Sequence, residues 1–168
     1  MTKTRYEVRR MSLDEYLAFE EKSSVKHEYV GGEVYAVSGT TIRHGRIAFN
    51  IARHLHNAAR SHGCAIVLSD VKVRAASDRI YYPDVLIACG RAKEADLIVN
   101  APSLIVEVTS PTTRATARRE KLDAYLKIPS LHTYLIVDQR RRHVLAYCRD
   151  AKGEWQRQET HAEGTVAI

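Results

Sequence analysis

The chain has 168 residues, of which 45% are hydrophobic and 27% are charged, and its formal net charge is +6. These proportions are typical of a soluble globular protein, and no run approaches the eighteen apolar residues of a membrane-spanning helix. The length predicts a single domain over residues 1–168. The basic balance fits a polyanionic partner, although solubility alone would explain it equally well.

Two features of the sequence predict a cytoplasmic protein. The opening "MTKTRYEVRR" lacks the apolar segment of a secretion signal. The three cysteines, Cys64, Cys89 and Cys148, lie far apart and form no C-x-x-C pair. This odd, scattered set argues against a disulfide framework or a thiolate zinc site and favours a reducing compartment.

The first elements in chain order are a helix and a hairpin. Residues 11–21 predict a helix, with Ser12 as its N-cap and Glu15 completing a capping box. Residues 26–37 form two alternating runs around Gly31-Gly32, which predicts a two-residue β-hairpin. In that register Glu28 shares one face of the hairpin with Val30, Glu33 and Tyr35.

A long amphipathic helix is predicted next, over residues 40–63, closed by Gly63. Its apolar side gathers Ile47, Ile51, Leu55 and Ala58. The opposite side carries Arg43, Arg46, Asn50, Arg53, Asn57 and Arg60. Segment 43–60 contains no acid, so this side is a candidate phosphate-contacting surface, with a merely solvated helix face as the alternative.

The second half of the chain predicts strands around one more helix. Strands are expected over residues 64–75, 79–89, 103–110, 132–138, 142–150 and 153–160. The helix is expected over residues 112–128, starting at a threonine cap after Pro111 and stopping before Pro129. This order predicts an α/β (α+β) fold, in which a mixed central sheet is flanked by helices and preceded by the N-terminal helix and hairpin.

Two acids interrupt these apolar strands. Glu107 lies inside "LIVEVTSP", and Asp84 opens the run "VLIA" directly after Pro83. Each acid alone is more simply a solvated or capped strand end. If the two strands are neighbours, however, the carboxylates meet at one edge, and repelling carboxylates are ordinarily neutralised by a divalent cation. The pair therefore predicts a metal site.

At these residues the sequence resembles a known family. "YPDVLIA", then "LIVEVTSP", then the helix and strand "RREKLDAYLKIPSLHTYLIVD" resemble the PD-(D/E)XK nuclease superfamily, and within it the restriction-endonuclease-like Uma-two family. The hairpin "HEYVGGEV" and His44 are also similar to that family's pattern. The resemblance extends from about residue 12 to residue 149 and implies a restriction-endonuclease-like fold.

The resemblance also implies a site. Asp84 and Glu107 would bind Mg²⁺ or Mn²⁺, and Glu28 and His44 match further positions that line the site. The lysine of the plain motif is replaced by Thr109, and the resemblance points to Lys121 on the following helix as the substitute catalytic cation. Helical spacing agrees with this, because Arg114, Arg118, Lys121 and Tyr125 fall on one face.

The functions that follow differ in class. The first hypothesis is a metal-dependent endonuclease that hydrolyses DNA, with Asp84, Glu107 and Lys121 catalytic and with phosphate contacts from Arg43, Arg46, Arg53 and Arg118. The alternative is a catalytically degenerate nuclease fold that binds nucleic acid or docks a partner, since Thr109 departs from the motif. A hydrolase of another phosphate ester is a third option. The superfamily resemblance further implies a homodimer, and no membrane partner is expected.

His44 is open to two interpretations, an active-site hydrogen-bonding residue or a satisfied core histidine. His54, His56 and His62 are expected to be surface histidines. Asp70 and Asp138 are expected to cap strand ends, although Asp70 would reach the site if its strand were adjacent.

Overall fold

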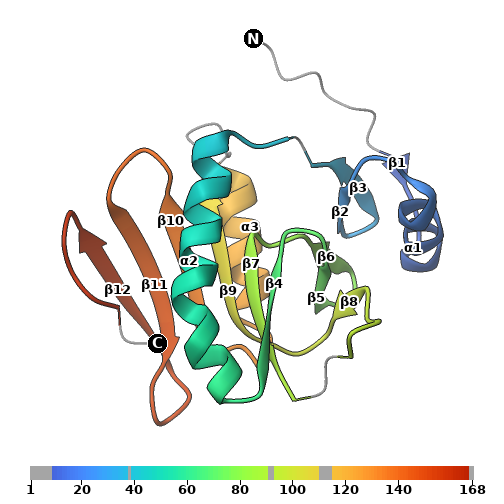
Figure 1. Cartoon of the computed structure of the whole chain (residues 1–168). Coiled ribbons are helices and arrows are strands. Elements are labelled where there is room, and N and C mark those ends of the chain that lie inside the picture. Colours follow the sequence, from blue (N-terminus) through green and yellow to red (C-terminus); the bar gives the residue numbers. More distant parts are fainter. Residues whose placement is uncertain (1–8, 38, 91–92, 110–114, 167–168) are drawn as a thin grey trace.

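The structure is a computed structural model that describes residues 9–37, 39–90, 93–109 and 115–166 (Figure 1). Within these residues the helices are α1 (Leu13–Lys22), α2 (Ile42–Ser61) and α3 (Ala115–Tyr125). The strands of the N-terminal half are β1 (Arg9–Arg10), β2 (His27–Val30), β3 (Glu33–Ala36), β4 (Cys64–Leu68), β5 (Lys72–Ala76) and β6 (Arg79–Tyr81). The later strands are β7 (Val85–Cys89), β8 (Ile98–Val99), β9 (Pro102–Thr109), β10 (Thr133–Asp138), β11 (His143–Arg149) and β12 (Trp155–His161). None of the helices in the described residues is long and apolar enough to cross a membrane.

The strands form two mixed sheets, which confirms the expected fold class: sheet B is the expected mixed sheet flanked by helices, and sheet A was not expected. Sheet A has the order β1-β3-β2-β6-β5-β8, and sheet B has the order β12-β11-β10-β9-β7-β4. In sheet B, β9 lies between β10, to which it is parallel, and β7, to which it is antiparallel. The strand that carries Glu107 therefore lies in the interior of its sheet.

The second sheet was not expected because two predicted strands are each broken in two. The run 79–89 leaves sheet A after β6 and enters sheet B as β7, and the break falls at Pro83, which cannot donate a ladder hydrogen bond. The run 64–75 divides in the same way into β4 of sheet B and β5 of sheet A. Strands β1 and β8, with two residues each, were also not predicted.

Helices α2 and α3 cover opposite faces of sheet B. One core joins Ala48, Ala52 and Ala59 of α2 to Val106 and to other alternate strand residues. The other core joins Ala124 and Tyr125 of α3 to Ile105 and the intervening strand residues. In Figure 1 α2 runs along the near face of the sheet. The arginine side of α2 is exposed as predicted, whereas Ala58 is exposed rather than buried because the three other alanines turn toward the sheet.

Local signals in the sequence set the ends of the elements as expected. Ser12 and Glu15 form the capping box of α1, and Thr41 accepts a hydrogen bond from the His44 N–H at the start of α2. Gly31 and Gly32 have φ of 57° and 91°, which a two-residue hairpin turn between β2 and β3 requires. The predicted threonine cap of α3 lies outside the described residues.

The cysteine prediction is wrong for two of the three residues. Cys64 begins β4 and Cys89 ends β7, and the two are register partners on antiparallel strands. Their Cα atoms are 4.1 Å apart and a disulfide joins them. The two cysteines are 25 residues apart and meet only because β4 and β7 are neighbours, so the sequence alone did not indicate the pairing. The argument for a reducing compartment therefore loses its basis.

Candidate active site

Asp84 and Glu107 lie on neighbouring strands of sheet B. Val85 at the start of β7 pairs with Val106 of β9, so the preceding Asp84 lies beside the following Glu107. The Val108 N–H donates a 2.7 Å hydrogen bond to Oδ2 of Asp84, which fixes the Asp84 carboxylate against β9. The adjacency that the metal prediction required is present.

Lys121 joins the acids of the two sheets. Its Nζ lies 3.0 Å from Oε1 of Glu107 in sheet B and 2.7 Å from Oε1 of Glu28 in sheet A. Tyr125, one helical turn later, donates its hydroxyl to the same Glu107 oxygen at 2.9 Å. The three charged side chains are only 13–18% exposed, so little solvent screens them. The helix face predicted from spacing thus meets Glu107.

His44 contacts the second acid. Its Nε2 lies 3.2 Å from Oδ2 of Asp84, and the His44 side chain is 11% exposed. The hydrogen bond to Asp84 raises the pKa of His44, against burial, which lowers it. Of the two interpretations of His44, the structure supports the one in which it bonds to a carboxylate of the site.

The negative charges of the acids in the site are not fully balanced by the nearby positive charges. Burial raises the pKa of Glu107 to about 7, and repulsion by Asp84 and Glu28 adds to this, against the attraction of Lys121. Burial acts to lower the pKa of Lys121, but attraction to Glu107 and Glu28 outweighs it and raises the pKa. The single positive charge of Lys121 therefore faces two carboxylates, Glu28 and Glu107, and can neutralise only one of them. Carboxylate oxygens with residual negative charge are the ligand type that a hard divalent cation such as Mg²⁺ or Mn²⁺ accepts.

The raised pKa of Glu107 makes stability depend on pH. Because this pKa, about 7, exceeds the ordinary 4.5, ionised Glu107 lowers the metal-free stability above pH 7. That penalty is relieved as the pH falls from 7 to 4.5. Glu107→Gln has no such penalty and leaves Lys121 paired with Glu28. We expect the stability of the variant relative to the native protein to be higher at pH 8 than at pH 5, by up to about 3 kcal/mol.

Urea unfolding in EDTA at the two pH values measures this difference. Glu94→Gln, at an exposed position, is the matched control and should show no pH-dependent difference. A Glu107→Gln variant that is equally destabilised at both pH values would instead make Glu107 a purely structural partner of Lys121.

Comparison with known proteins places the chain in a family. The family model described as "Uma2: Putative restriction endonuclease" matches residues 13–168. The chain belongs to the Uma2 family. The "Uncharacterized protein slr1290" and "Uncharacterized protein sll1609" of Synechocystis sp. (strain ATCC 27184 / PCC 6803 / Kazusa) are each 32% identical to it. Their alignments cover 87% and 84% of this chain, and 78% and 82% of the two relatives.

A solved structure shares the fold. The crystal structure of "a putative nuclease belonging to DUF820 from Anabaena variabilis ATCC 29413" superposes with a TM-score of 0.77. The match covers 94% of this chain and 89% of that chain, at 16% sequence identity. The family resemblance and the mixed α/β fold expected from the order of the elements are both confirmed.

The other predicted residues of this Uma2 protein differ in their contacts and exposure. Thr109 donates its hydroxyl to the Val137 carbonyl oxygen at 3.3 Å, so its side chain is engaged with β10. Asp70 pairs with Lys26, and Asp138 accepts the Arg140 N–H at 2.7 Å, as a strand-end cap does. Histidines 54, 56 and 62 are exposed as expected, Arg118 is partly buried, and Arg114 lies outside the described residues.

Three contacts of the site were not anticipated. Glu120 accepts a 2.9 Å hydrogen bond from Nε of Arg79 and also bonds to the Tyr81 hydroxyl, which ties α3 to β6. The Lys121 ammonium lies 5.4 Å from the centre of the Tyr81 ring. All three contacts cross from α3 to sheet A, and no local pattern in the sequence signals them.

Proposed function

We propose that this Uma2 protein is a divalent-metal-dependent endonuclease that hydrolyses phosphodiester bonds of DNA. The observation that carries the proposal is the contact at 3.0 Å between Lys121 Nζ and Glu107 Oε1. The motif has a lysine two residues after this acid, where this chain has Thr109, and Lys121 brings a positive charge to Glu107 from α3 instead. Membership of a family described as "Putative restriction endonuclease" supports the same reaction class.

Each residue has a role in this proposal. Asp84 and Glu107 would hold Mg²⁺ or Mn²⁺, which supplies Lewis acidity and activation of water. The Val108 N–H and His44 orient Asp84, while the Tyr125 hydroxyl orients Glu107. The Lys121 ammonium would stabilise the negative charge that develops on the phosphoryl oxygens, in surroundings that screen it weakly.

A cleavage assay tests the proposal. Linear duplex DNA, single-stranded DNA and RNA would be incubated with the native protein and with Glu107→Ala, in Mg²⁺, in Mn²⁺ and in EDTA. We expect native protein to cut DNA with either metal, and Glu107→Ala to be inactive. Failure of native protein to cut any substrate in either metal contradicts the proposal.

One observation favours a second candidate function, a nuclease fold that binds nucleic acid without cleaving it. On β9 the position two residues after Glu107 holds Thr109, which hydrogen-bonds to Val137, and no lysine stands there. Lys121 is itself paired with two carboxylates. DNA binding that is sensitive to salt, without cleavage in any divalent metal, would identify this function.

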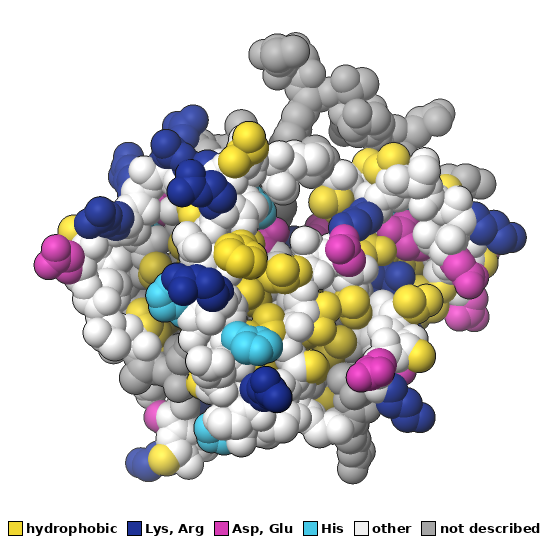
Figure 2. Space-filling view, viewed as in Figure 1, with side chains coloured by type: hydrophobic (Ala, Val, Ile, Leu, Met, Phe, Trp, Pro, Cys, Tyr) yellow, Lys and Arg dark blue, Asp and Glu magenta, His cyan; other side chains and the backbone are white. Residues whose placement is uncertain are grey.

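The surface proposed to contact DNA is basic. Arg43, Arg46 and Arg53 are exposed on α2. A shallow groove continues from Arg43 to the β10–β11 loop, where Arg140, Arg141 and Arg142 line it. Figure 2 shows that Lys and Arg side chains predominate over acidic ones on the half of the molecule that carries α2. Phosphate contacts of this kind position a duplex without reading its sequence.

Binding to DNA through this surface should weaken steeply with salt. For about four phosphate contacts, affinity falls about a hundredfold between 50 and 200 mM salt. Replacing Arg43, Arg46 and Arg53 by Gln should lower the slope of log affinity against log salt by about three. Fluorescence anisotropy in EDTA, with Arg10→Gln on β1 as the exposed control, measures the slope. An unchanged slope in the triple variant would exclude α2 from the interface.

A homodimer is part of this proposal, because cutting both strands of a duplex in one encounter takes two active sites. Light scattering of the native protein tests it, and a monomeric mass at assay concentrations would contradict it.

A further inference from the structure

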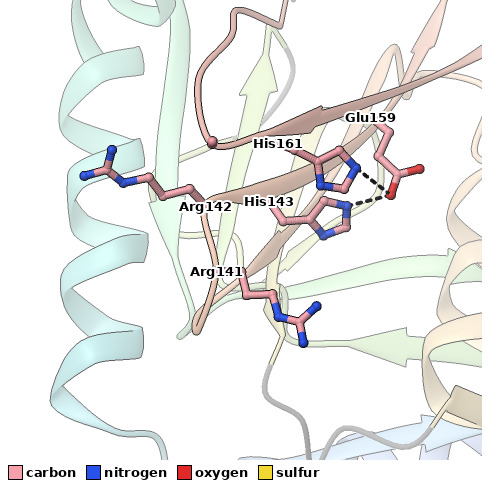
Figure 3. A pocket seen from close by; sticks show the side chains of 6 residues that line it. Arg141, Arg142, His143, Glu159 and His161 are labelled. Atoms are coloured by element: carbon pink, nitrogen blue, oxygen red, sulfur yellow. Dashed lines mark hydrogen bonds and ion pairs between the residues drawn. The ribbon is translucent and has the colours of Figure 1, made fainter.

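A second cluster of metal-binding side chains lies on the β11–β12 hairpin. His143 begins β11 and His161 ends β12, and the two are register partners. Their rings stack with centroids 4.6 Å apart at 20°. Glu159, two residues before His161 and so on the same face of β12, extends its carboxylate to both rings. Figure 3 shows the three side chains converging.

The geometry gathers three potential ligand atoms at one point. Nε2 of His143 lies 2.7 Å, and Nε2 of His161 lies 3.5 Å, from the same oxygen, Oε1 of Glu159. The three ligand atoms lie within 4.8 Å of one another, and this is the one such group of three or more His, Cys, Asp or Glu found in the described residues. The two ring nitrogens thus face the same carboxylate oxygen.

The neighbouring arginines do not occupy the space between the three ligand atoms. Arg157 binds the other carboxylate oxygen, Oε2, at 2.7 Å and so holds the carboxylate with Oε1 toward the rings. Arg141 and Arg142 line the same pocket, but their side chains extend away from the three ligands (Figure 3). His161 is 71% exposed and His143 is 21% exposed, so water has access to complete a coordination shell.

We propose that His143, Glu159 and His161 form a surface site for a divalent transition metal of the zinc class. Two imidazoles and one carboxylate, with an open position for water, are a ligand set that Zn²⁺ accepts. Because Arg157 balances the Glu159 charge, binding depends on the nitrogen donors more than on net charge. The site therefore discriminates against Mg²⁺, which prefers oxygen ligands, and takes Zn²⁺, Ni²⁺ or Cu²⁺.

The site acts as a clasp between β11 and β12. Strand β12 is the edge of sheet B, and the cluster lies at the open end of the hairpin, opposite its connecting turn. A metal that bridges the two strands binds only when they are paired, so it stabilises that pairing. In sheet B, β12 is separated from β9 by β10 and β11, and the proposal is independent of the nuclease proposal.

Titration with Zn²⁺ tests the clasp. The Asp84→Asn protein, which lacks one proposed ligand of the acidic site, would be titrated by calorimetry in excess Mg²⁺. We expect one equivalent of Zn²⁺ to bind, and the melting temperature to rise with it. Adding His143→Gln or His161→Gln should weaken Zn²⁺ at least about tenfold, since even outer-shell changes at metal sites cost that much. His161 is exposed and His143 is partly exposed, so these variants should fold.

The matched control is His56→Gln, an exposed histidine on α2, which should leave Zn²⁺ uptake unchanged. Co²⁺ gives a second readout, since its visible absorption should appear with the Asp84→Asn protein and disappear when His161→Gln is added. Equal Zn²⁺ affinity with and without both histidine replacements would overturn the proposal, and so would loss of uptake in His56→Gln.

Discussion

Replacing Lys121 by alanine is expected to lower the rate of DNA cleavage by about a hundredfold or more, the usual cost of one positioned transition-state donor. Lys121 contacts both Glu28 and Glu107, and Thr109 supplies no cation in its place. Mn²⁺ affinity should not fall, because the ammonium is not a ligand and its removal leaves the carboxylates more negative. Cleavage at saturating metal and calorimetry with Mn²⁺ separate the two effects.

The matched control is Lys127→Ala, an exposed lysine just after α3, which should retain the native rate. Thr109→Lys added to Lys121→Ala should restore part of the activity, because residues 107 and 109 lie on one face of β9. Cleavage by Lys121→Ala within a few-fold of native would eliminate Lys121 as the catalytic cation, and Arg118 would be tested next.

The second large effect is expected from Asp84→Asn, which should greatly weaken Mn²⁺ binding and abolish cleavage. The amide oxygen of asparagine can still accept the Val108 N–H, so the local fold should be retained while the charge is lost. Calorimetry with Mn²⁺ on the folded variant measures the change.

Asp70→Asn is the control for this prediction, because Asp70 is an exposed aspartate that pairs with Lys26. Equal Mn²⁺ uptake by native and Asp84→Asn proteins would show that Asp84 is not a metal ligand. Loss of Mn²⁺ uptake in Asp70→Asn would show that the metal site had been assigned to the wrong aspartate.

Much of the fold was predictable because local chemistry determines it. The capping box of Ser12 and Glu15, the Gly31-Gly32 turn and the amphipathic α2 each depend on neighbours in sequence. The approach of Lys121 and Tyr125 to Glu107 also followed, since helical spacing and the family resemblance together placed them on the face that meets the strand.

The remainder depends on pairings between distant segments. Apolar residues lie on both sides of Pro83 and Asp84 in residues 79–89, so the pattern does not reveal that Pro83 divides two sheets. The bond between Cys64 and Cys89 and the meeting of His143 with His161 depend on strand register, which is fixed only when the sheets form. Residue spacing alone carries no signal of either.

The crossing of the chain at Pro83 also has a consequence for how the protein folds. Glu28 belongs to sheet A, while Glu107 belongs to sheet B, and the hydrogen bond from Tyr82 N–H to Glu28 already spans 54 residues. Closing such loops costs entropy that local helices and hairpins do not incur. The helices can therefore form before the carboxylates converge, and refolding should restore helical content before it restores metal affinity. Metal uptake, which needs Asp84 beside Glu107, would then report that β7 and β9 of sheet B have paired.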